Sequence, residues 1–219
     1  MSAQKSLEQL DGHAGFVPPR YARGKRTADA LLDSGRKLLR THSLDGMTIE
    51  DLCAGANVTT GAFYRRFESK DAFFKALQSL AMEDATVGNR ALLAELDSRE
   101  WALGEGIALL VRNSRLWYCL HEGVIRASQM QRSRDARSWE PIKQLGIAYV
   151  EQMAPRVERM RGVPPWPDLP LRIRFGFQMM FGTLVNAVAN NPGPLELTSP
   201  MLDVELARSF CAYLCAAPG

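Results

Sequence analysis

The sequence lacks the features that mark a membrane or secreted protein. No apolar run reaches the roughly 18 to 20 residues that a membrane-spanning helix needs, and the opening stretch, Met1 to Asp11, has no apolar core of a secretory signal. Cysteine is scarce, with four in 219 residues, so a disulfide framework is not expected in a chain of this size. We therefore expect a cytoplasmic protein without a membrane span.

Catalytic and metal-binding motifs are also missing. There is no Gly-rich phosphate loop, no HExxH and no GxSxG, and the Cys119-Leu120-His121 run stands without a supporting motif. Cys211 and Cys215 lie one helical turn apart and could hold a metal, but no histidine is near them in sequence, which favours a reduced pair in the core. We expect no enzyme, cofactor or metal; an enzyme with a helical fold is the remote alternative.

What the sequence does contain is helical periodicity, without short strand-like runs or internal repeats. Apolar residues make up 46% of the chain, which is enough to bury a core, and the formal charge is only +3. We predict an all-α fold, with helices over about 27–42, 48–56, 61–67, 70–96, 101–112, 116–131, 135–160, 171–189 and 201–214.

Two short helices joined by a tight turn stand out near the N-terminus. Thr48 is suited to cap the first, with Asp51 three residues on as an approximate capping box. Asn57 tolerates the left-handed conformation that the turn requires, and Thr59 or Thr60 caps the second helix. This arrangement is typical of a helix-turn-helix, and we assign residues 25–75 to a DNA-binding domain.

The second short helix carries its polar side chains on one face. Phe63 and Phe67 are four residues apart and turn inward, which directs Tyr64, Arg65 and Arg66 outward. Taken singly, each is more typical of a solvated face, but together on a helix that follows such a turn they favour double-stranded DNA. The DNA-binding candidates are Thr48, Thr59, Thr60, Gly61, Tyr64, Arg65, Arg66 and Lys70.

Residues 1–24 are predicted to form a flexible, basic N-terminal arm. These residues include two prolines and three glycines. The stretch that leads into the first helix holds Arg20, Arg23, Lys25 and Arg26 with no acidic residue between them. Such an arm either contacts DNA or is a solvated tail.

The segment from Leu31 to Leu77 resembles the N-terminal domain of the TetR family of bacterial repressors. The resemblance is carried by Leu31-Leu32-Asp33-Ser34, by Thr48-Ile49-x-x-Leu52 and by Val58-Thr59-x-Gly61-x-Phe63-Tyr64-x-x-Phe67-x-Ser69-Lys70-Asp71-Ala72-Phe73. It implies that Thr48, Tyr64 and Lys70 contact phosphates, that Thr59, Thr60, Gly61 and Arg65 lie at or near the bases, and that Arg66 serves either role.

Three departures from the family pattern accompany this match. Asn57 replaces the usual turn glycine, and Cys53 and Gly55 replace the usual alanines. Arg65 and Arg66 stand where the family often has His or Tyr followed by an aromatic residue. The last difference concerns which operator is bound rather than whether DNA is bound.

The resemblance further implies that residues 76–219 bind a small effector and form a homodimer. The stretch 171–189 is apolar nearly all round, so one side is expected to meet the core and the other a second chain, although a core helix in a monomer is the alternative. The last helix is the natural second half of a four-helix interface. The interface candidates are Phe175, Met179, Gly182, Val185, Phe210 and Leu214.

Aromatic and sulfur-containing residues are frequent in the same region, which suggests a mostly apolar effector. The ligand-binding candidates are Trp117, His121, Met130, Trp139 and Tyr149, although any one aromatic is more often a core residue. The expected protein is a dimeric repressor that binds a palindromic operator and is released by its effector. A regulator that uses its C-terminal part only to dimerise is the alternative.

Overall fold

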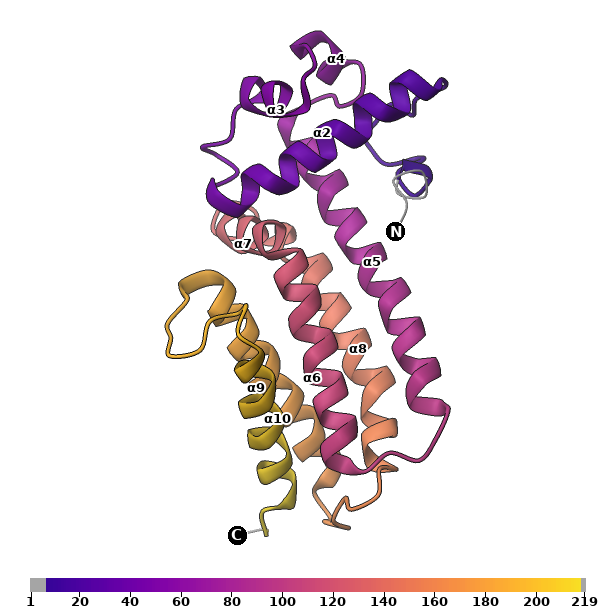
Figure 1. Cartoon of the computed structure of the whole chain (residues 1–219), viewed down its shortest axis with the longest axis vertical. Helices are drawn as coiled ribbons and strands as arrows, with labels where there is room; N and C mark the ends of the chain where they lie inside the picture. The colour runs from indigo at the N-terminus through magenta and orange to yellow at the C-terminus, as the bar shows by residue number, and fades with distance from the viewer. Residues whose placement is uncertain (1–6, 218–219) are drawn as a thin grey trace. The chain divides into compact units, whose positions relative to one another are not determined.

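The computed structural model describes residues 7–217 and is built of helices (Figure 1). Within this range no strand forms, and β-type pairing is limited to isolated bridges between Phe16 and Phe67 and between Ala102 and Arg161. No described helix combines the length and apolarity that crossing a bilayer demands. The predicted all-α class is confirmed.

The chain divides into two compact units. Unit 1 comprises the described residues up to Asp84 together with His121–Arg134, and unit 2 comprises Ala85–Leu120 together with the described residues from Asp135 onward. Unit 1 holds α2 (Ala22–Thr41), α3 (Ile49–Ala56), α4 (Thr60–Tyr64), the first part of α5 (Lys70–Asp97) and α7 (Glu122–Gln131). Unit 2 holds the rest of α5, α6 (Leu103–Leu120), η1 (Ala136–Ser138), α8 (Glu140–Glu158), α9 (Leu169–Asn190) and α10 (Pro200–Cys215).

Three phenylalanines form the centre of unit 1. Phe63, Phe67 and Phe73 are each fully buried. Their ring centroids lie 4.9 to 5.7 Å apart, with the Phe67 and Phe73 rings edge to face. This is the separation at which aromatic pairs attract beyond simple burial. The cluster joins α4 to the beginning of α5.

The N-terminal segment differs from the flexible arm that composition suggested. Leu7, Leu10 and Phe16 are buried, and the Phe16 ring stacks 5.3 Å from that of Phe67. Backbone hydrogen bonds from Val17 N to Arg66 O (2.8 Å) and from Glu68 N to Gly15 O (2.9 Å) join the segment to the residues after α4. Apolar side chains at three positions, too few to show a period, supply this packing.

Helix α7 is separate from α6, contrary to the predicted single helix over 116–131. α6 ends at Leu120, and α7 begins after His121, whose backbone leaves the helical region. The break lets Gly123 approach the backbone of Leu39, where a Cβ atom would lie only 2.5 Å from the Leu39 oxygen. Arg126 then donates hydrogen bonds to the carbonyls of Leu39 and Arg40 at the end of α2. Tertiary packing on α2 therefore decides where the helix breaks.

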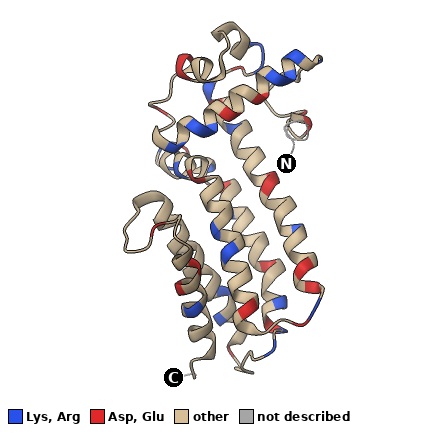
Figure 2. Cartoon of the chain, viewed as in Figure 1, with Lys and Arg blue, Asp and Glu red and all other residues tan. Residues whose placement is uncertain are grey.

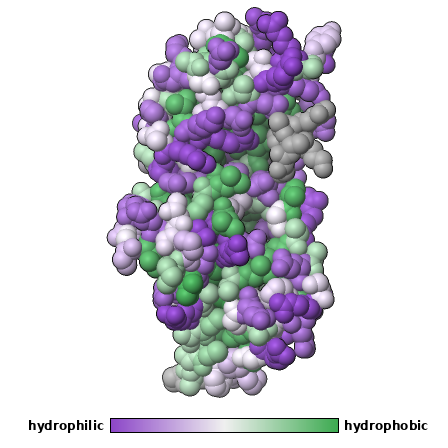
Figure 3. All heavy atoms as spheres, in the orientation of Figure 1, coloured by the Kyte–Doolittle hydropathy of each residue, from purple (hydrophilic) through white to green (hydrophobic). Residues whose placement is uncertain are grey.

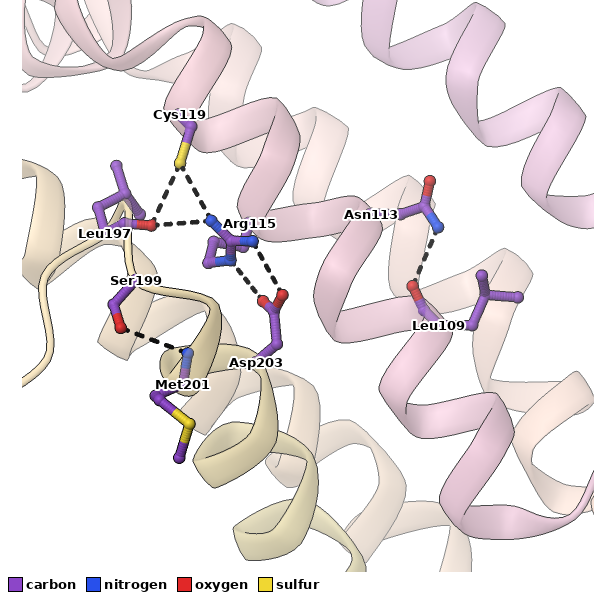
Figure 4. Close-up of polar contacts among 8 residues, drawn as sticks. All are labelled: Leu109, Asn113, Arg115, Cys119, Leu197, Ser199, Met201 and Asp203. Atoms are coloured by element: carbon purple, nitrogen blue, oxygen red, sulfur yellow. Dashed lines mark hydrogen bonds and ion pairs between the residues drawn. The ribbon is translucent and has the colours of Figure 1, made fainter.

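In unit 2, α6 is continuous where the sequence suggested a break between residues 112 and 116. Asn113 lies inside the helix and donates its side-chain amide to the Leu109 carbonyl 3.0 Å away (Figure 4). The predicted helix over 135–160 instead begins with η1 and continues as α8 from Glu140.

Helices α9 and α10 pack closely because a glycine lies at their contact. Gly176 faces the ring of Phe210, and a Cβ atom at this position would overlap that ring. Phe177 lies beside it, with its ring centroid 5.2 Å from that of Phe210. Both phenylalanines are buried, so this contact forms part of the core of unit 2.

A buried ion pair holds α10 against α6 (Figure 4). Arg115 Nε and Nη2 donate to the two carboxylate oxygens of Asp203 at 2.5 and 2.9 Å. Arg115 Nη1 and the Cys119 thiol both donate to the Leu197 carbonyl at 3.2 Å, which ties down the loop before α10. The Arg115 side chain is only 7% exposed, and its hydrogen bonds to Asp203 raise the pKa of the guanidinium. The Arg115 charge is thus paired at a site with little exposure to water.

Helices α2 and α3 meet at a pair of small residues. A Cβ atom at Gly55 would overlap the hydroxyl of Ser34. That hydroxyl is buried and finds no hydrogen-bond partner among the described residues. The family that this segment resembles has alanine at both positions. Here Ser34 is larger and Gly55 is smaller than alanine, which preserves the close approach of α2 and α3.

We predict that the residues at 34 and 55 are energetically coupled. Gly55→Ala alone should destabilise unit 1 by about 1–3 kcal/mol, because the new methyl group overlaps the Ser34 hydroxyl. In a Ser34→Ala background the same change should stabilise by about 1 kcal/mol, because alanine favours the helix over glycine. Urea unfolding of the two single variants and the double variant measures the coupling. Additive effects would contradict this packing account.

A second prediction concerns the buried ion pair. Asp203→Ala should cost about 3–5 kcal/mol of unfolding free energy, because it leaves the Arg115 charge buried and unpaired. Replacing both residues by apolar ones, as in Arg115→Met with Asp203→Leu, should cost much less. Glu105→Ala is the control, since its ion pair with Arg99 is more than half exposed at both side chains and should contribute at most about 1 kcal/mol. Equal losses in Asp203→Ala and Glu105→Ala would refute the assignment.

Candidate nucleic-acid interface

Helix α3 begins with the capping box that the sequence predicted. Thr48 Oγ1 accepts a hydrogen bond from the Asp51 amide at 3.0 Å, and Asp51 Oδ2 accepts from the Thr48 amide at 3.2 Å. The Thr48 hydroxyl also donates to Asp51 Oδ2 at 2.6 Å, and these bonds lower the pKa of the carboxyl. Because both donors of Thr48 are engaged by Asp51, its clearest role in this structure is to begin α3.

The turn after α3 has the predicted left-handed residue. Asn57 adopts φ 53° and ψ 48°, which confirms the prediction made for this position. Val58 N then donates to Cys53 O at 2.9 Å, and Thr59 begins the next helix by accepting a hydrogen bond from the Ala62 amide at 3.2 Å. Of the two threonines considered as caps, the structure selects Thr59 and leaves the Thr60 side chain exposed.

Helix α4 exposes one narrow polar face. Phe63 is buried, whereas Tyr64 is 57% exposed, and Thr60, Gly61 and Arg65 are exposed with it. The helix ends at Tyr64, shorter than the predicted 61–67, and the chain then turns so that Phe67 joins the core.

Gly61 lies in open space on this face. A Cβ atom there would approach only the Thr59 hydroxyl, at 3.9 Å. Packing within the chain therefore does not require glycine, and its small size benefits a surface that another molecule approaches closely.

Arg66 and Lys70 are tied into the scaffold more than the sequence suggested. Arg66 is half-buried, and its guanidinium lies within 3.5 Å of the carbonyls of Val17 and Arg65. Lys70 Nζ donates to Met47 O at 2.9 Å and to Asp45 O at 3.3 Å, which joins the start of α5 to the loop before α3. An ammonium group has three donors, so two of those of Lys70 are engaged by these carbonyls.

The five residues left with free outward faces are Thr59, Thr60, Gly61, Tyr64 and Arg65. They combine hydroxyl donors, a guanidinium and an uncrowded backbone, and α4 itself contains no acidic residue. Arginine can donate two hydrogen bonds to guanine in the major groove, and hydroxyl groups can donate to phosphate oxygens. The exposed face of α4 therefore carries groups that are chemically suited to the bases and phosphates of duplex DNA.

The predicted ligand-binding residues are divided between the two units. His121 and Met130 belong to unit 1, whereas Trp117, Trp139 and Tyr149 belong to unit 2. His121 is buried and hydrogen-bonded to Asp84 Oδ2 at 3.0 Å, with burial lowering its pKa, while Met130 is 57% exposed. His121 thus contributes to the packing of unit 1, and Met130 lies on its surface.

Within unit 2, an aromatic cluster occupies the core. Tyr149 is buried, burial raises the pKa of its phenol, and its ring lies 5.6 Å from Phe181 and 5.8 Å from Phe177. Tyr118 lies between Trp117 and Phe181, with centroid distances of 5.3 and 6.5 Å. Phe177, Tyr118 and Phe181 were not among the named candidates, because period alone does not separate one buried aromatic from another.

A surface cleft of about 310 Å³ lies elsewhere in unit 2. Its lining contains Leu96, Asp97, Arg99, Glu100, Trp101, Arg156, Arg159 and Met160. Arg156 pairs with Asp97, and the Arg99 guanidinium stacks on the Trp101 ring. None of the predicted ligand-binding residues takes part, and the charged lining does not suit a mostly apolar effector.

The candidate dimer residues divide into core and surface. Phe210 and Leu214 are 3% and 0% exposed within the single chain, so they pack in its core instead of facing a partner. Phe175 and Gly182 are exposed on α9, and Met179 and Val185 are partly exposed. Three further apolar residues are exposed on the same helices, Leu171, Met201 and Val204.

The cysteines near the C-terminus do not form the expected core pair. Cys211 is partly buried, whereas Cys215 is exposed. Across residues 7–217 no three His, Cys, Asp or Glu side chains are grouped as metal ligands would be.

Comparison with known proteins adds independent information. A family model described as "Bacterial regulatory proteins, tetR family" matches residues 31–77. The HTH-type transcriptional regulator EthR of Mycobacterium tuberculosis is 28% identical over 158 residues, which cover 65% of this chain and 70% of EthR.

Solved structures share the fold. A protein assigned to the TetR family from Mesorhizobium loti has a TM-score of 0.59 at 14% identity, with 98% of this chain and 97% of that chain covered. The transcriptional regulator FadR from Bacillus subtilis, in complex with stearoyl-CoA, has a TM-score of 0.54 at 15% identity, with 88% and 98% covered.

Proposed function

We propose that this chain is a TetR-type transcription regulator, as its match to the family model over residues 31–77 and its similarity to EthR support. It acts as a homodimeric repressor in the cytoplasm. Its α4 reads a palindromic operator, and its C-terminal helices respond to a small apolar effector. The observation that carries the proposal is the exposed face of α4. Its buried Phe63 fixes the helix, and Tyr64 and Arg65 project from it beside Gly61.

Base recognition is assigned to Arg65, and phosphate contact to Tyr64 and Lys70. Arg65 is exposed and follows directly on α4, while Arg66 is held against the N-terminal segment and contributes charge from a fixed position. Lys70 begins α5, whose free amide groups and positive dipole end also attract phosphate. Thr59, Thr60 and Gly61 lie at the N-terminal end of α4, which enters the groove first.

Operator binding is tested by sequencing the genomic fragments that the protein retains and measuring affinity for them. Arg65→Ala should relax preference at one base pair and cost about 1–3 kcal/mol of binding free energy. Lys70→Ala should weaken binding to all sequences alike. The control is Arg132→Ala, which removes an exposed arginine just after α7. It should change neither the base-pair preference nor the overall affinity. Binding without sequence preference in the unaltered protein would contradict the proposal.

For the homodimer we propose the exposed apolar faces of α9 and α10. Leu171 and Phe175 project from α9, and Met201 and Val204 project from α10. Figure 3 shows apolar side chains at the surface over these C-terminal helices. Contiguous apolar surface on two neighbouring helices is typical of a subunit interface.

Dimerisation is tested by sedimentation of charged variants. Phe175→Asp, and Phe175→Asp with Met201→Asp, should shift the protein from dimer to monomer, because each dimer would bury the added carboxylates. Val87→Asp is a matched control, since Val87 on α5 has the same 41% exposure as Phe175. A monomeric unaltered protein, or unchanged sedimentation of the double variant, would exclude this interface.

The proposed effector is mostly apolar. The aromatic residues of unit 2, among them Trp117, Tyr118 and Tyr149, form an apolar cluster to which such a compound is suited. FadR, which has the same fold, was solved with stearoyl-CoA, a ligand with a long apolar chain. Binding would shift the population toward a dimer whose two α4 helices no longer fit successive major grooves.

Effector response is tested by titrating stearoyl-CoA and small aromatic compounds against the protein on its operator. A compound that binds is expected to weaken operator affinity at least about tenfold, which corresponds to roughly 1.4 kcal/mol of coupling. A tightly bound compound that leaves DNA affinity unchanged would instead favour the alternative, a regulator that uses unit 2 only to dimerise.

A further inference from the structure

The beginning of α2 places positive charge where an isolated helix does not favour it. α2 starts at Ala22 after Tyr21, no side chain caps it, and its first turn contains no acidic residue. Arg23 and Lys25 occupy that first turn, with Arg20 just before it and Arg26 just after. The N-terminal end of a helix carries a partial positive charge, so cations there repel the helix dipole and one another. Figure 2 shows Lys and Arg at this end of α2.

The arginines of this cluster are available to a partner. Arg20, Arg23 and Arg26 are exposed, and none of them forms an ion pair with the other described residues. The acidic groups nearby include Asp29, whose pKa the Lys25 charge lowers against the larger effect of burial, and Glu68, which lies beside Gly15. Tyr21, at 79% exposure, lies among the arginines and adds a hydroxyl donor.

The cluster is held next to the recognition helix. Arg66, two residues after α4, packs against Gly24, where a Cβ atom would lie only 2.5 Å from Nη2. The preceding chain is anchored by the Val17–Arg66 hydrogen bond and by the Phe16 ring against Phe67. The cations therefore have a fixed place beside α4 and do not depend on a flexible tail.

We propose that Arg20, Arg23 and Arg26, with the free amide groups at the start of α2, form a second DNA contact that binds backbone phosphates flanking the groove entered by α4. This inference rests on the proposed DNA-binding function and extends its footprint. A phosphate at this end of α2 would satisfy the unpaired amide groups and neutralise the repelling charges. Duplex DNA is the partner because its phosphates lie beside any groove that α4 occupies.

The test compares Arg20→Ala/Arg23→Ala/Arg26→Ala with a control that loses the same charge elsewhere, Arg112→Ala/Arg132→Ala/Arg161→Ala. All six arginines are exposed. Affinity for the retained operator is measured between 50 and 200 mM salt, about the range over which phosphate contacts dominate the change. The slope of log affinity against log salt should become shallower by about 0.9 for each cation that touched a phosphate. The slope of the α2 variant should thus be shallower by about 2.7 per subunit, for its three arginines, and that of the control should change little.

Two further variants and one stability measurement make the outcome specific. Arg20→Lys/Arg23→Lys/Arg26→Lys should restore most of the affinity, because phosphate accepts a point charge. The melting temperature of the DNA-free alanine variant should be unchanged or higher, because the repulsion at the helix end is relieved. A loss of affinity with a lower melting temperature would overturn the proposal, as would a loss that depends on the flanking base sequence.

Failure of this inference is distinguishable from failure of the proposed function. If the unaltered protein binds its operator and the α2 variant behaves as the control does, the second contact is refuted and α4 remains the DNA-binding element. If the unaltered protein binds no operator, and Arg65→Ala has no effect, the proposed function itself is wrong.

Discussion

The burial of Phe63 is the constraint on which the proposed interface depends. Its ring packs with Phe67 and Phe73, and α4 is only five residues long, so propensity alone would not maintain it. Because one side of α4 is fixed in this aromatic cluster, Tyr64 and Arg65 must face outward. The capping threonines and the left-handed Asn57 set where the helix begins, and the phenylalanines set which way it faces.

A polar contact plays the corresponding part in unit 2. The Arg115–Asp203 pair joins α6 to α10 and, through the Leu197 carbonyl, fixes the loop before α10. Its geometry is bidentate and nearly closed to water, so it orders α10 specifically where apolar contacts alone would tolerate sliding. Phe210 and Leu214 are buried in this packing, and the apolar residues that remain exposed on α9 and α10 are those of the proposed interface.

The sequence was informative where local chemistry decides structure. The Thr48–Asp51 capping box, the left-handed Asn57 and the inward Phe63 follow from side chains within a few positions of each other. It was less informative for the boundary at His121, because α7 turns there to pack Gly123 against Leu39, a contact remote in sequence. The prediction that Phe210 and Leu214 on α10 face a partner was wrong for a similar reason. Periodicity identifies an apolar helix but not which neighbour covers each of its faces.

The sequence by itself therefore determined an all-α protein with a helix-turn-helix and the residue types on the exposed face of α4. Tertiary structure alone decided that Arg66 is held by the N-terminal segment and that the basic start of α2 lies beside α4. The physical reason is that caps and turns depend on contacts a few residues apart. The availability of a charged side chain depends instead on which distant carbonyls and rings surround it after folding.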